Sequence, residues 1–405
     1  MISFENTECA FEYKSTKELK KANLLFSAMG HPLLVNLGLK LTPPVIKYNI
    51  PFTKQLIRNT IFSQFVGGET LEQTAAVVNN LAKYHVQVIL DYGVEGGENG
   101  EKGYDGATEE FIKVINYAAT QKNIPFMSIK VTGIVRFGLL ERLDASMHQC
   151  EGTLMKRYTQ AVEALPAREK EEWQRVVNRF STICETAGRK NVGVLVDAEE
   201  TWIQDPVDAI TILMMDTHNK ERAVVFNTLQ LYRHDRLAFM KESHKAAVER
   251  NFILGTKLVR GAYMEKERKR ALDNGYPSPI QPDKESTDRD FNACIEYCID
   301  HLDRIFVIVA SHNEYSNLYT TQLLDQKGIA HDHRHVHFSQ LYGMSDNITF
   351  NLARSGCSVS KYLPFGPIKD VIPYLMRRAQ ENSSMSGQTG RELVLIKKEL
   401  ARRRN

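Results

Sequence analysis

The sequence lacks the features that define several large classes of proteins. No apolar run approaches the ~20 residues of a transmembrane helix, and the opening MISFENTECAFEYKSTKEL has acidic residues and no apolar core, so we expect no span, signal or transit peptide. The six cysteines include no C-x-x-C pair, which favours reduced thiols in the cytoplasm. A formal charge of +3 is too small to indicate a nucleic-acid partner.

The chain also lacks a G-x-G-x-x-G fingerprint after its first predicted strand, which argues against a dinucleotide-binding turn. The glycines of GVEGGENGEKGYDG match neither that fingerprint nor a phosphate loop. The remaining composition, 42% hydrophobic and 25% charged, is ordinary for a globular protein. A length of 405 residues suits two average domains or one large barrel.

Eight short apolar runs alternate with amphipathic helical stretches. The runs are VQVILDYG, PFMSIKVTG, VGVLVDAEE, RAVVFNTLQLY, ILGTKLVRGAY, RIFVIVASHN, HVHFSQLYG and SVSKYLPFG. Apolar strands that alternate with helices indicate a parallel sheet covered on both faces. Eight such units predict an α/β fold, a closed (β/α)8 TIM-type barrel.

Each predicted strand carries a polar residue near its carboxyl end. These residues are Asp91, Lys130, Asp197, Gln230, Lys257, His312, Gln340 and Tyr362. The carboxyl ends of barrel strands meet at one mouth, where active sites are built. Because burying a polar group without a partner costs roughly several kcal/mol, eight of them at equivalent ends predict a polar site at that mouth.

Two segments fall outside the repeating units. Residues 1–65 are expected to form an N-terminal helical arm, and residues 66–405 the barrel domain. Within the barrel domain, residues 139–190 are expected to form a helical insertion between the second and third strands, with a break near Pro166.

Two groups of residues at the mouth could supply chemistry. Lys130 and Asp197 could form a buried ion pair, in which the lysine acts as a Schiff-base nucleophile, a general base or an electrostatic anchor. In KLVRGAY, Lys257, Arg260 and Tyr263 surround a glycine, where the backbone can approach a planar ligand closely.

The alternating histidines of HDHRHVHF raise the question of a metal site. Their spacing would allow zinc or iron. The run begins before its strand, however, at the end of the barrel opposite the mouth. We therefore expect no metal.

The predicted helix PYLMRRAQENSS has a polar stripe. Tyr374, Arg377, Arg378 and Glu381 follow i, i+3, i+4, i+7 spacing and share one face, and apolar residues occupy the other. A solvated charged face is the commoner explanation of such a stripe. The alternative is a two-arginine clamp for a small anion, because guanidinium groups bind carboxylate and phosphate bidentately.

The segments KLVRGAY and YLPFGPIKDVIPYLMRRAQENSS resemble proline dehydrogenase, the flavin-dependent first enzyme of proline catabolism. The resemblance covers about residues 60–400 and is most specific at YLMRRAQEN. It is to the stand-alone form found in mitochondria and some bacteria. It implies oxidation of L-proline to Δ1-pyrroline-5-carboxylate, with hydride passing from C5 to N5 of FAD and electrons then reaching a quinone.

The resemblance also implies roles for single residues. The catalytic set would be Lys130, Asp197, Arg377 and Arg378, with both arginines and Lys130 on the proline carboxylate. The ring would be walled by Tyr263, Leu341, Tyr362 and Tyr374, and Glu95 would pair with Arg377 to gate the site. Flavin contacts would come from Gln230, Lys257, Val259, Gly261, Ala262, Lys284, Thr287, Ser311, His312, Asn313 and Glu381.

Two residues depart from the bifunctional bacterial members of this family. Met264 replaces a tryptophan that packs on the flavin, and Lys257 replaces an arginine near N5. Both changes keep the apolar or cationic character, so activity is expected with altered flavin packing.

Three alternatives stay open at this point. Hydroxyproline oxidation on the same scaffold is one, although in that variant a small residue would replace Tyr362. A flavin-free lyase or aldolase that forms a Schiff base on Lys130 or Lys257 is the second. The third is a binding protein that uses the basic C-terminal KKELARRRN on a membrane or a nucleic acid. For the favoured enzyme we expect a cytoplasmic location, or peripheral contact with the inner face of a membrane, on the matrix side in a eukaryote.

Overall fold

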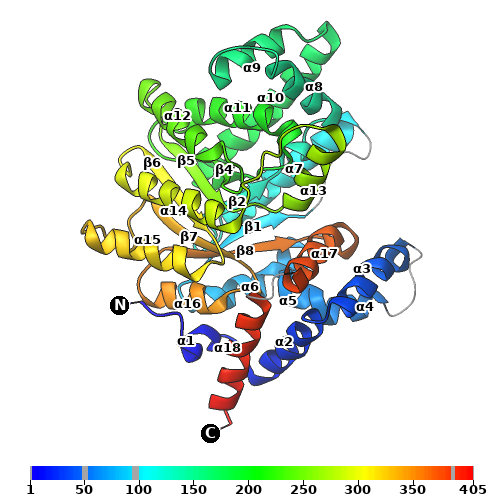
Figure 1. The fold of residues 1–405 in the computed structure, drawn as a ribbon, viewed down its shortest axis with the longest axis vertical. Coiled ribbons are helices and arrows are strands. Elements are labelled where there is room, and N and C mark those ends of the chain that lie inside the picture. The colour runs from blue at the N-terminus through cyan, green and yellow to red at the C-terminus, as the bar shows by residue number, and fades with distance from the viewer. Residues whose placement is uncertain (1, 48–52, 94–99, 385–387, 405) are drawn as a thin grey trace. The chain divides into compact units, whose positions relative to one another are not determined.

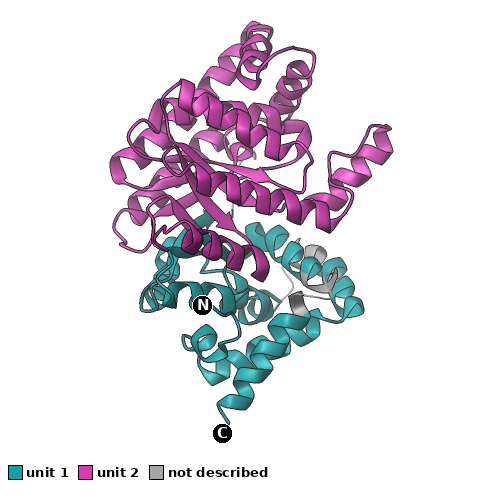
Figure 2. Ribbon diagram, turned by 60° about the vertical axis from the view of Figure 1, so that its left-hand side comes forward, with its two compact units in different colours: residues 1–94, 338–405 teal, residues 95–337 magenta. Residues whose placement is uncertain are grey.

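A computed structural model describes residues 2–47, 53–93, 100–384 and 388–404 of the chain. The chain divides into two compact units (Figure 2). The first is formed by residues 1–94 together with residues 338–405, and the second by residues 95–337.

Eight parallel strands close a barrel in the order β1-β2-β3-β4-β5-β6-β7-β8 (Figure 1). They are Gln87–Tyr92 (β1), Phe126–Ile129 (β2), Gly193–Val196 (β3), Val225–Gln230 (β4), Leu254–Val259 (β5), Ile305–Ala310 (β6), Val336–Leu341 (β7) and Val359–Phe365 (β8). The predicted (β/α)8 barrel and all eight predicted strands are confirmed. Strands such as β3, in which every residue is buried, are apolar on both faces because helices cover the sheet.

In the unit of residues 95–337, aromatic rings pack among the strands. The ring centroids of Phe126 and Phe226 lie 5.5 Å apart and those of Phe226 and Phe306 5.0 Å apart, all edge-to-face. Phe126 pairs with Gly193 in the register of β2 and β3. A Cβ atom on Gly193 would lie 2.5 Å from the Phe126 ring, so glycine is what admits this packing.

The same unit contains the predicted helical insertion. Between β2 and β3 lie the short turn η2 (Val131–Gly133) and three helices, α8 (Phe137–Met147), α9 (Leu154–Glu163) and α10 (Ala167–Lys190), so the insertion is confirmed, with its break at Pro166. Trp173 fixes α10 against α9, because its indole donates to the Tyr158 hydroxyl at 2.9 Å. The other helices are α7 (Glu101–Ala118), α11 (Thr201–His218), α12 (Arg236–Glu249), α13 (Met264–Asn274), α14 (Lys284–Asp300) and α15 (Glu314–Gln326).

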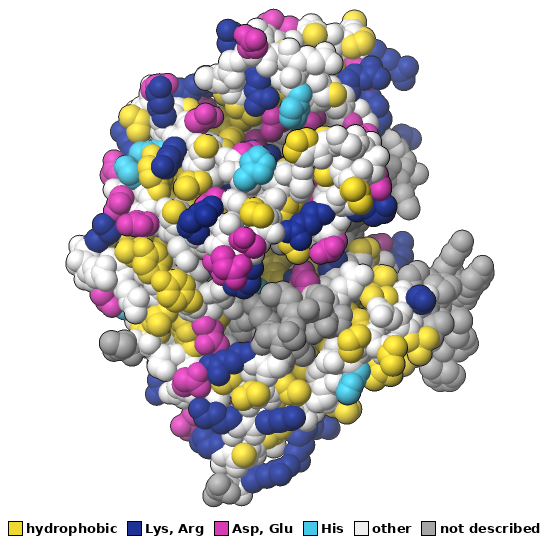
Figure 3. Space-filling model, in the orientation of Figure 1, with side chains coloured by type: hydrophobic (Ala, Val, Ile, Leu, Met, Phe, Trp, Pro, Cys, Tyr) yellow, Lys and Arg dark blue, Asp and Glu magenta, His cyan; other side chains and the backbone are white. Residues whose placement is uncertain are grey.

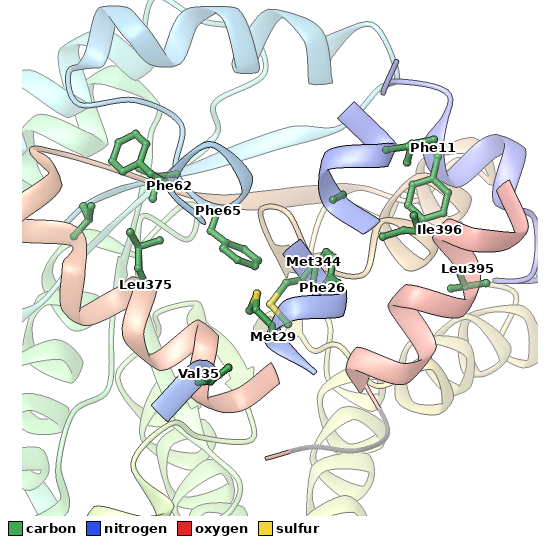
Figure 4. Packing of buried hydrophobic residues seen from close by; sticks show 14 of the residues in the cluster. Phe11, Phe26, Met29, Val35, Phe62, Phe65, Met344, Leu375, Leu395 and Ile396 are labelled. Atoms are coloured by element: carbon green, nitrogen blue, oxygen red, sulfur yellow. The ribbon is translucent and has the colours of Figure 1, made fainter. Parts of the chain in front are cut away.

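The unit of residues 1–94 and 338–405 brings the two ends of the chain together. Its helical elements are α1 (Thr7–Phe11), α2 (Thr16–Met29), α3 (Pro32–Lys47), α4 (Thr53–Ile57), η1 (Arg58–Phe62), α5 (Ser63–Phe65), α6 (Leu71–Ala82), α16 (Asp346–Arg354), α17 (Ile368–Ser384) and α18 (Gln388–Arg402). A capping box of Ser15 and Glu18 starts α2. Apolar side chains of α1, α2, α3, η1, α5, α17 and α18 share one core, which includes Phe26, Phe65, Leu375 and Ile396 (Figure 4).

A buried ionic cluster also ties α1 to this unit. The ammonium of Lys361, on β8, lies 2.9 Å from the Asp346 carboxylate, and neither side chain is exposed. Lys14 donates to the same carboxylate at 2.9 Å and Tyr13 at 2.7 Å. These neighbouring cations keep the pKa of Asp346 below its usual value, although burial opposes them.

The basic C-terminus is engaged within the same unit. Arg402 and Arg403 both pair with Glu399, and Arg402 also pairs with Glu8. Arg391 pairs with Glu5. Over the residues that the structure describes, no single helix has the length and hydropathy of a membrane span. The helix pair Thr16–Met29 and Pro32–Lys40, bent by 89°, has the length and composition of a span only when the two helices are taken together.

Candidate active site

Lys257 and Asp197 form an ion pair at the carboxyl ends of β5 and β3. Lys257 is buried inside the barrel, and Asp197 follows β3 directly, with its amide donating to the Ile129 carbonyl at 2.9 Å. The sequence analysis expected Lys130 to pair with this carboxylate. In the structure the Asp197 carboxylate accepts from Lys257, and the positive charge of Lys130 acts on Glu199.

Glu199 is a buried carboxyl group that the sequence analysis missed. It accepts hydrogen bonds from the Thr132 hydroxyl at 2.7 Å and the Thr132 amide at 3.3 Å. Burial raises its pKa to about 7, against the opposing effects of the Thr132 hydrogen bonds and the Lys130 charge. The signal was the acidic run in VGVLVDAEE, in which Glu199 and Glu200 are both buried, but periodicity does not say which partners each carboxylate has.

Gln230, expected to contact flavin, lies in this cluster. Its side-chain amide donates to the Glu199 backbone carbonyl at 3.0 Å. Glu199, Gln230 and the Lys257–Asp197 pair thus place both signs of charge and an amide at the ends of β3, β4 and β5. A site of this kind can bind and orient a polar substrate.

Arg260, one residue beyond β5, organises a second cluster. Its guanidinium donates to Asp288 at 2.8 Å, to the Ser311 hydroxyl at 2.7 Å and to the Ser316 hydroxyl at 3.0 Å. Lys284 pairs with the same Asp288. The sequence analysis singled out KLVRGAY but gave Arg260 no ligand role. Asp288 and Ser311 lie 28 and 51 residues further along the chain than Arg260, so these contacts could not be predicted from local sequence.

The expected flavin residues after β6 are held in one turn. Asn313 caps α15, since its side chain accepts from the Ser316 amide at 3.0 Å, and its own amide donates to Ser311 Oγ at 3.1 Å. His312 lies between them. Lys284 and Thr287 occupy the first turn of α14, where Asp283 is the N-cap. The structure therefore brings Lys284, Thr287, Ser311, His312 and Asn313 to the region of Arg260.

Gly261 has φ +132°, a conformation that suits glycine. A Cβ atom there would lie 1.8 Å from the Tyr232 ring. The backbone at Gly261 therefore packs closely on the Tyr232 ring. This contact explains the glycine without the planar ligand that the sequence analysis expected there. Val259 ends β5, and Ala262 and Tyr263 follow the glycine on the path to α13.

The polar stripe of α17 is not a solvated face. Arg378 is only 6% exposed, its guanidinium lies 5.0 Å from the Tyr374 ring centroid, and its Nη2 donates to Glu381 at 2.6 Å. The opposite face of α17, with Val371 and Leu375, packs into the core. The prediction that the helix divides into an apolar and a polar face is confirmed.

Tyr374 has a buried hydroxyl with no hydrogen-bond partner among the residues that the structure describes. Burial raises the pKa of this phenol above its usual value, and burial likewise raises the pKa of Glu381 against the attraction of Arg378. A buried hydroxyl without a partner beside a guanidinium is the arrangement expected of a site that completes its hydrogen bonds with a polar ligand.

The remaining expected substrate residues belong to the strands of the same unit. Leu341 ends β7 and is paired in register with Tyr362 of β8, which is also paired with Ile89 of β1. Arg377 is half-buried on α17. Glu95, the expected partner of Arg377, lies outside the described residues.

The histidine run has structural contacts. His335 Nδ1 lies 2.6 Å from the Leu302 carbonyl, and the ring centroid of His337 lies 5.1 Å from that of Phe126. Burial lowers the pKa of His337 to about 3, so this imidazole is neutral. In the described ranges, no group of three or more His, Cys, Asp or Glu side chains could hold a metal ion.

The donor set of residues 257–313 fits a flavin dinucleotide. Arg260 and Lys284 supply cations, Ser311 a hydroxyl and the start of α14 backbone amides, which are the groups that bind a pyrophosphate. Lys257 adds a buried cation of the kind that stabilises negative charge on a reduced flavin ring.

A closed parallel (β/α)8 barrel with charged clusters at the carboxyl ends of its strands is the architecture of an enzyme. A family model described as "Proline dehydrogenase" matches residues 74–391. The chain belongs to the proline dehydrogenase family and is an oxidoreductase.

Several curated relatives cover most of the chain. "Carbapenem antibiotics biosynthesis protein CarD" of Pectobacterium carotovorum subsp. carotovorum is 36% identical and covers 84% of each chain. "Proline dehydrogenase 1, mitochondrial" of Caenorhabditis elegans is 30% identical over 99% of this chain and 88% of its own. "Hydroxyproline dehydrogenase" of Xenopus laevis is 30% identical over 97% and 88%.

A solved structure supports the fold. Proline utilization A from Bdellovibrio bacteriovorus superposes with a TM-score of 0.71 and 17% identity over 95% of this chain. The chain spans only 38% of that longer protein. At this identity the match bears on the fold alone.

Proposed function

We propose that the protein is an FAD-dependent dehydrogenase that oxidises L-proline to Δ1-pyrroline-5-carboxylate, the first step of proline catabolism. The observation that carries the proposal is the polar face of α17, where a buried guanidinium, Arg378, is held between Glu381 and the Tyr374 ring. A small amino acid presents the carboxylate that such a guanidinium binds best.

The proposed substrate site has one set of residues for the carboxylate and another for the ring. Arg377, Arg378 and Lys130 bind the proline carboxylate, and Asp197 balances the cations. Tyr263, Leu341, Tyr362 and Tyr374 contact the ring, and Glu95 gates the site through Arg377. Fixing the carboxylate and the ring orients C5 for hydride transfer, and positioning of this kind is the main contribution of a protein to cofactor chemistry.

The proposed cofactor site lies at the ends of β4, β5 and β6. Gln230, Lys257, Val259, Gly261 and Ala262 would hold the ring system. Lys284, Thr287, Ser311, His312, Asn313 and Glu381 would hold the rest of the dinucleotide, and we add Arg260 to this set because it contacts Ser311. When bound there, FAD would supply the hydride acceptor for the oxidation of proline.

Proline must lose an amine proton before hydride leaves, because the product carries a C=N bond. The cluster of Lys130, Arg377 and Arg378 favours the neutral amine by like-charge repulsion. Glu199, with a pKa near neutrality, is a candidate to take the proton.

Electrons then pass to a quinone at a membrane, so we place the enzyme in the cytoplasm or the mitochondrial matrix, in peripheral contact with that membrane. Hydroxyproline is the second candidate substrate, because relatives of this length include proteins named hydroxyproline dehydrogenase. Tyr362 favours proline, because its ring fills space that a substrate hydroxyl would need.

Product analysis tests the proposal. Purified protein is incubated with an artificial electron acceptor and either L-proline or trans-4-hydroxy-L-proline, and the cyclic imine is trapped with o-aminobenzaldehyde. The proposal expects the coloured adduct from proline at the higher kcat/KM. Borohydride trapping of substrate on Lys130 or Lys257, with no acceptor reduced, would instead support the Schiff-base enzyme.

A further inference from the structure

The helices α2, α3 and α4 expose leucine side chains that a water-soluble surface has no need to carry. Leu33 is 85% exposed and Leu24 73%, and Leu34, Leu37 and Leu56 are also more than half exposed. Figure 3 shows hydrophobic side chains gathered on the surface over α3 and α4. Scattered leucines are ordinary on a protein surface, but a group on adjoining helices indicates an interaction site.

The helix α3 is apolar on both of its sides. Val35 and Leu39 face the core of the unit, whereas Leu33, Leu34 and Leu37 are exposed. An apolar cavity of about 220 Å³ lies under this helix, lined by residues of α2, α3, η1 and α17, among them Val35, Leu39, Ile61 and Leu375. A helix that is hydrophobic all round requires an apolar environment on both sides.

Charge sets this segment apart from the rest of the chain. Residues 19–68 contain no Asp or Glu, but they contain Lys20, Lys21, Lys40, Lys47, Lys54 and Arg58. Of these, Arg58 pairs with Glu69, just beyond the segment. Lys20, Lys40 and Lys54 are exposed and form no ion pair with any described residue, in contrast to Arg391, Arg402 and Arg403 near the C-terminus.

We propose that this exposed face of α2, α3 and α4 docks on the surface of an anionic lipid bilayer. The leucines enter the boundary between headgroups and acyl chains, and the lysines contact the lipid phosphates, as in other interfacial helices. The cavity under α3 gives room for part of an acyl chain. The proposed function includes peripheral contact with a membrane, and this inference rests on that part of it by naming the face that makes the contact. It does not depend on the reaction itself.

A second copy of the chain is a poorer occupant. A two-fold dimer through this face would place the same patch on both sides of the interface. Lys20, Lys40 and Lys54 would then meet like charges without an acidic partner from residues 19–68. Anionic lipid supplies the opposite charge.

Flotation with vesicles tests the surface without any substrate. The full-length holoenzyme is mixed with phosphatidylcholine vesicles, with or without phosphatidylglycerol, at low and high salt. We expect binding to the anionic vesicles that weakens with salt. The triple variant Leu33→Ser, Leu34→Ser, Leu37→Ser should partition at least about tenfold less, because three apolar side chains no longer leave water.

Two controls separate this surface from other effects. Leu272→Ser removes a leucine of α13 that is 83% exposed, and should leave partitioning unchanged. The triple variant Lys20→Glu, Lys40→Glu, Lys54→Glu should lose the preference for anionic vesicles, whereas Lys122→Glu with Lys190→Glu should keep it. Turnover with a water-soluble acceptor should be the same in all variants, which establishes that they are folded.

Three results would overturn the inference. They are a wild-type protein that does not float with anionic vesicles, a triple leucine variant that floats as well as wild type, and a concentration-dependent dimer in ultracentrifugation that the leucine variant abolishes. The last would assign the face to a second copy. A protein that floats but does not oxidise proline would contradict the proposed function alone.

Discussion

Nη2 of Arg378 lies 2.6 Å from Oε1 of Glu381, one turn further along α17. The ion pair and the Tyr374 ring hold the guanidinium in place while the side chain is buried. A side chain that is already ordered loses less conformational entropy when it binds a ligand. The pair therefore prepares Arg378 to bind a carboxylate.

Replacing this guanidinium tests its role in substrate binding. Arg378→Met should raise KM for proline by roughly 10–100-fold, the cost of a lost charge-assisted hydrogen bond, with a smaller effect on kcat. The flavin content of the purified protein should not change. Arg378→Lys keeps the charge but loses the two parallel donors of the guanidinium, so its KM should lie between those of wild type and the methionine variant. An unchanged KM in the methionine variant would remove Arg378 from the substrate site.

Substrate preference should depend on Tyr362. Tyr362→Ser opens space beside the ring and should shift the ratio of kcat/KM for hydroxyproline over proline upward by about tenfold. Tyr362→Phe is the matched control, because it keeps the ring and should leave the ratio unchanged. Steady-state kinetics with both substrates measure the effect. A ratio that is the same in the serine variant would contradict the proposed contact.

Cofactor retention should depend on Arg260. Arg260→Ala removes the guanidinium that joins Asp288 to Ser311, and the Kd for FAD should rise by about tenfold or more. Arg270→Ala is the control. Arg270 lies on α13, and its guanidinium lies 4.1 Å from the ring centroid of Trp202. The ratio of flavin to protein absorbance after gel filtration gives the result. Equal retention in both variants would show that Arg260 is not a flavin ligand.

The sequence was sufficient for the barrel, because β-branched runs bounded by turn residues mark each strand and a parallel sheet needs them apolar throughout. It was also sufficient for the two faces of α17, which follow from helical periodicity. It was not sufficient for the partners of the charged groups. Two cations, Lys130 and Lys257, lie near strand ends, and the sequence did not indicate the contact that Lys257 makes with Asp197 in the folded chain.

The partners of neighbouring carboxylates were also beyond the sequence. Glu199 and Glu200 are both buried, but Glu199 accepts a hydrogen bond from Thr132 whereas Glu200 pairs with Lys266. Arg260 was named in KLVRGAY, but its partners could not be predicted, because its contacts come from α14 and from the residues after β6. Local patterns identify the elements, and contacts distant in sequence identify the site.

The raised pKa of Glu199 predicts how the stability of the folded protein depends on pH. Its value of about 7 in the folded protein exceeds the ordinary 4.5, so between these pH values the folded protein binds more protons than the unfolded chain. The contribution of Glu199 to stability therefore falls as pH rises through this window. The glutamine of Glu199→Gln does not titrate. The free energy of unfolding of this variant, relative to that of wild type, should therefore rise by on the order of 1–3 kcal/mol between pH 5 and pH 8.

Thermal unfolding of both proteins at the two pH values measures this gain. The difference in Tm between Glu199→Gln and wild type should be more positive at pH 8. The control is the same substitution at the neighbouring buried carboxylate, Glu200→Gln, which pairs with Lys266. If the Tm difference for Glu199→Gln is the same at both pH values, the carboxyl group is not held in a raised-pKa environment.

Anaerobic mixing with proline tests the central claim most directly. The purified protein should be yellow, and saturating L-proline should bleach its absorbance near ~450 nm, the band of an oxidised flavin, as hydride passes to the bound cofactor. Arg378→Met should bleach only at higher proline concentration. A flavin that stays oxidised at saturating proline would contradict the account.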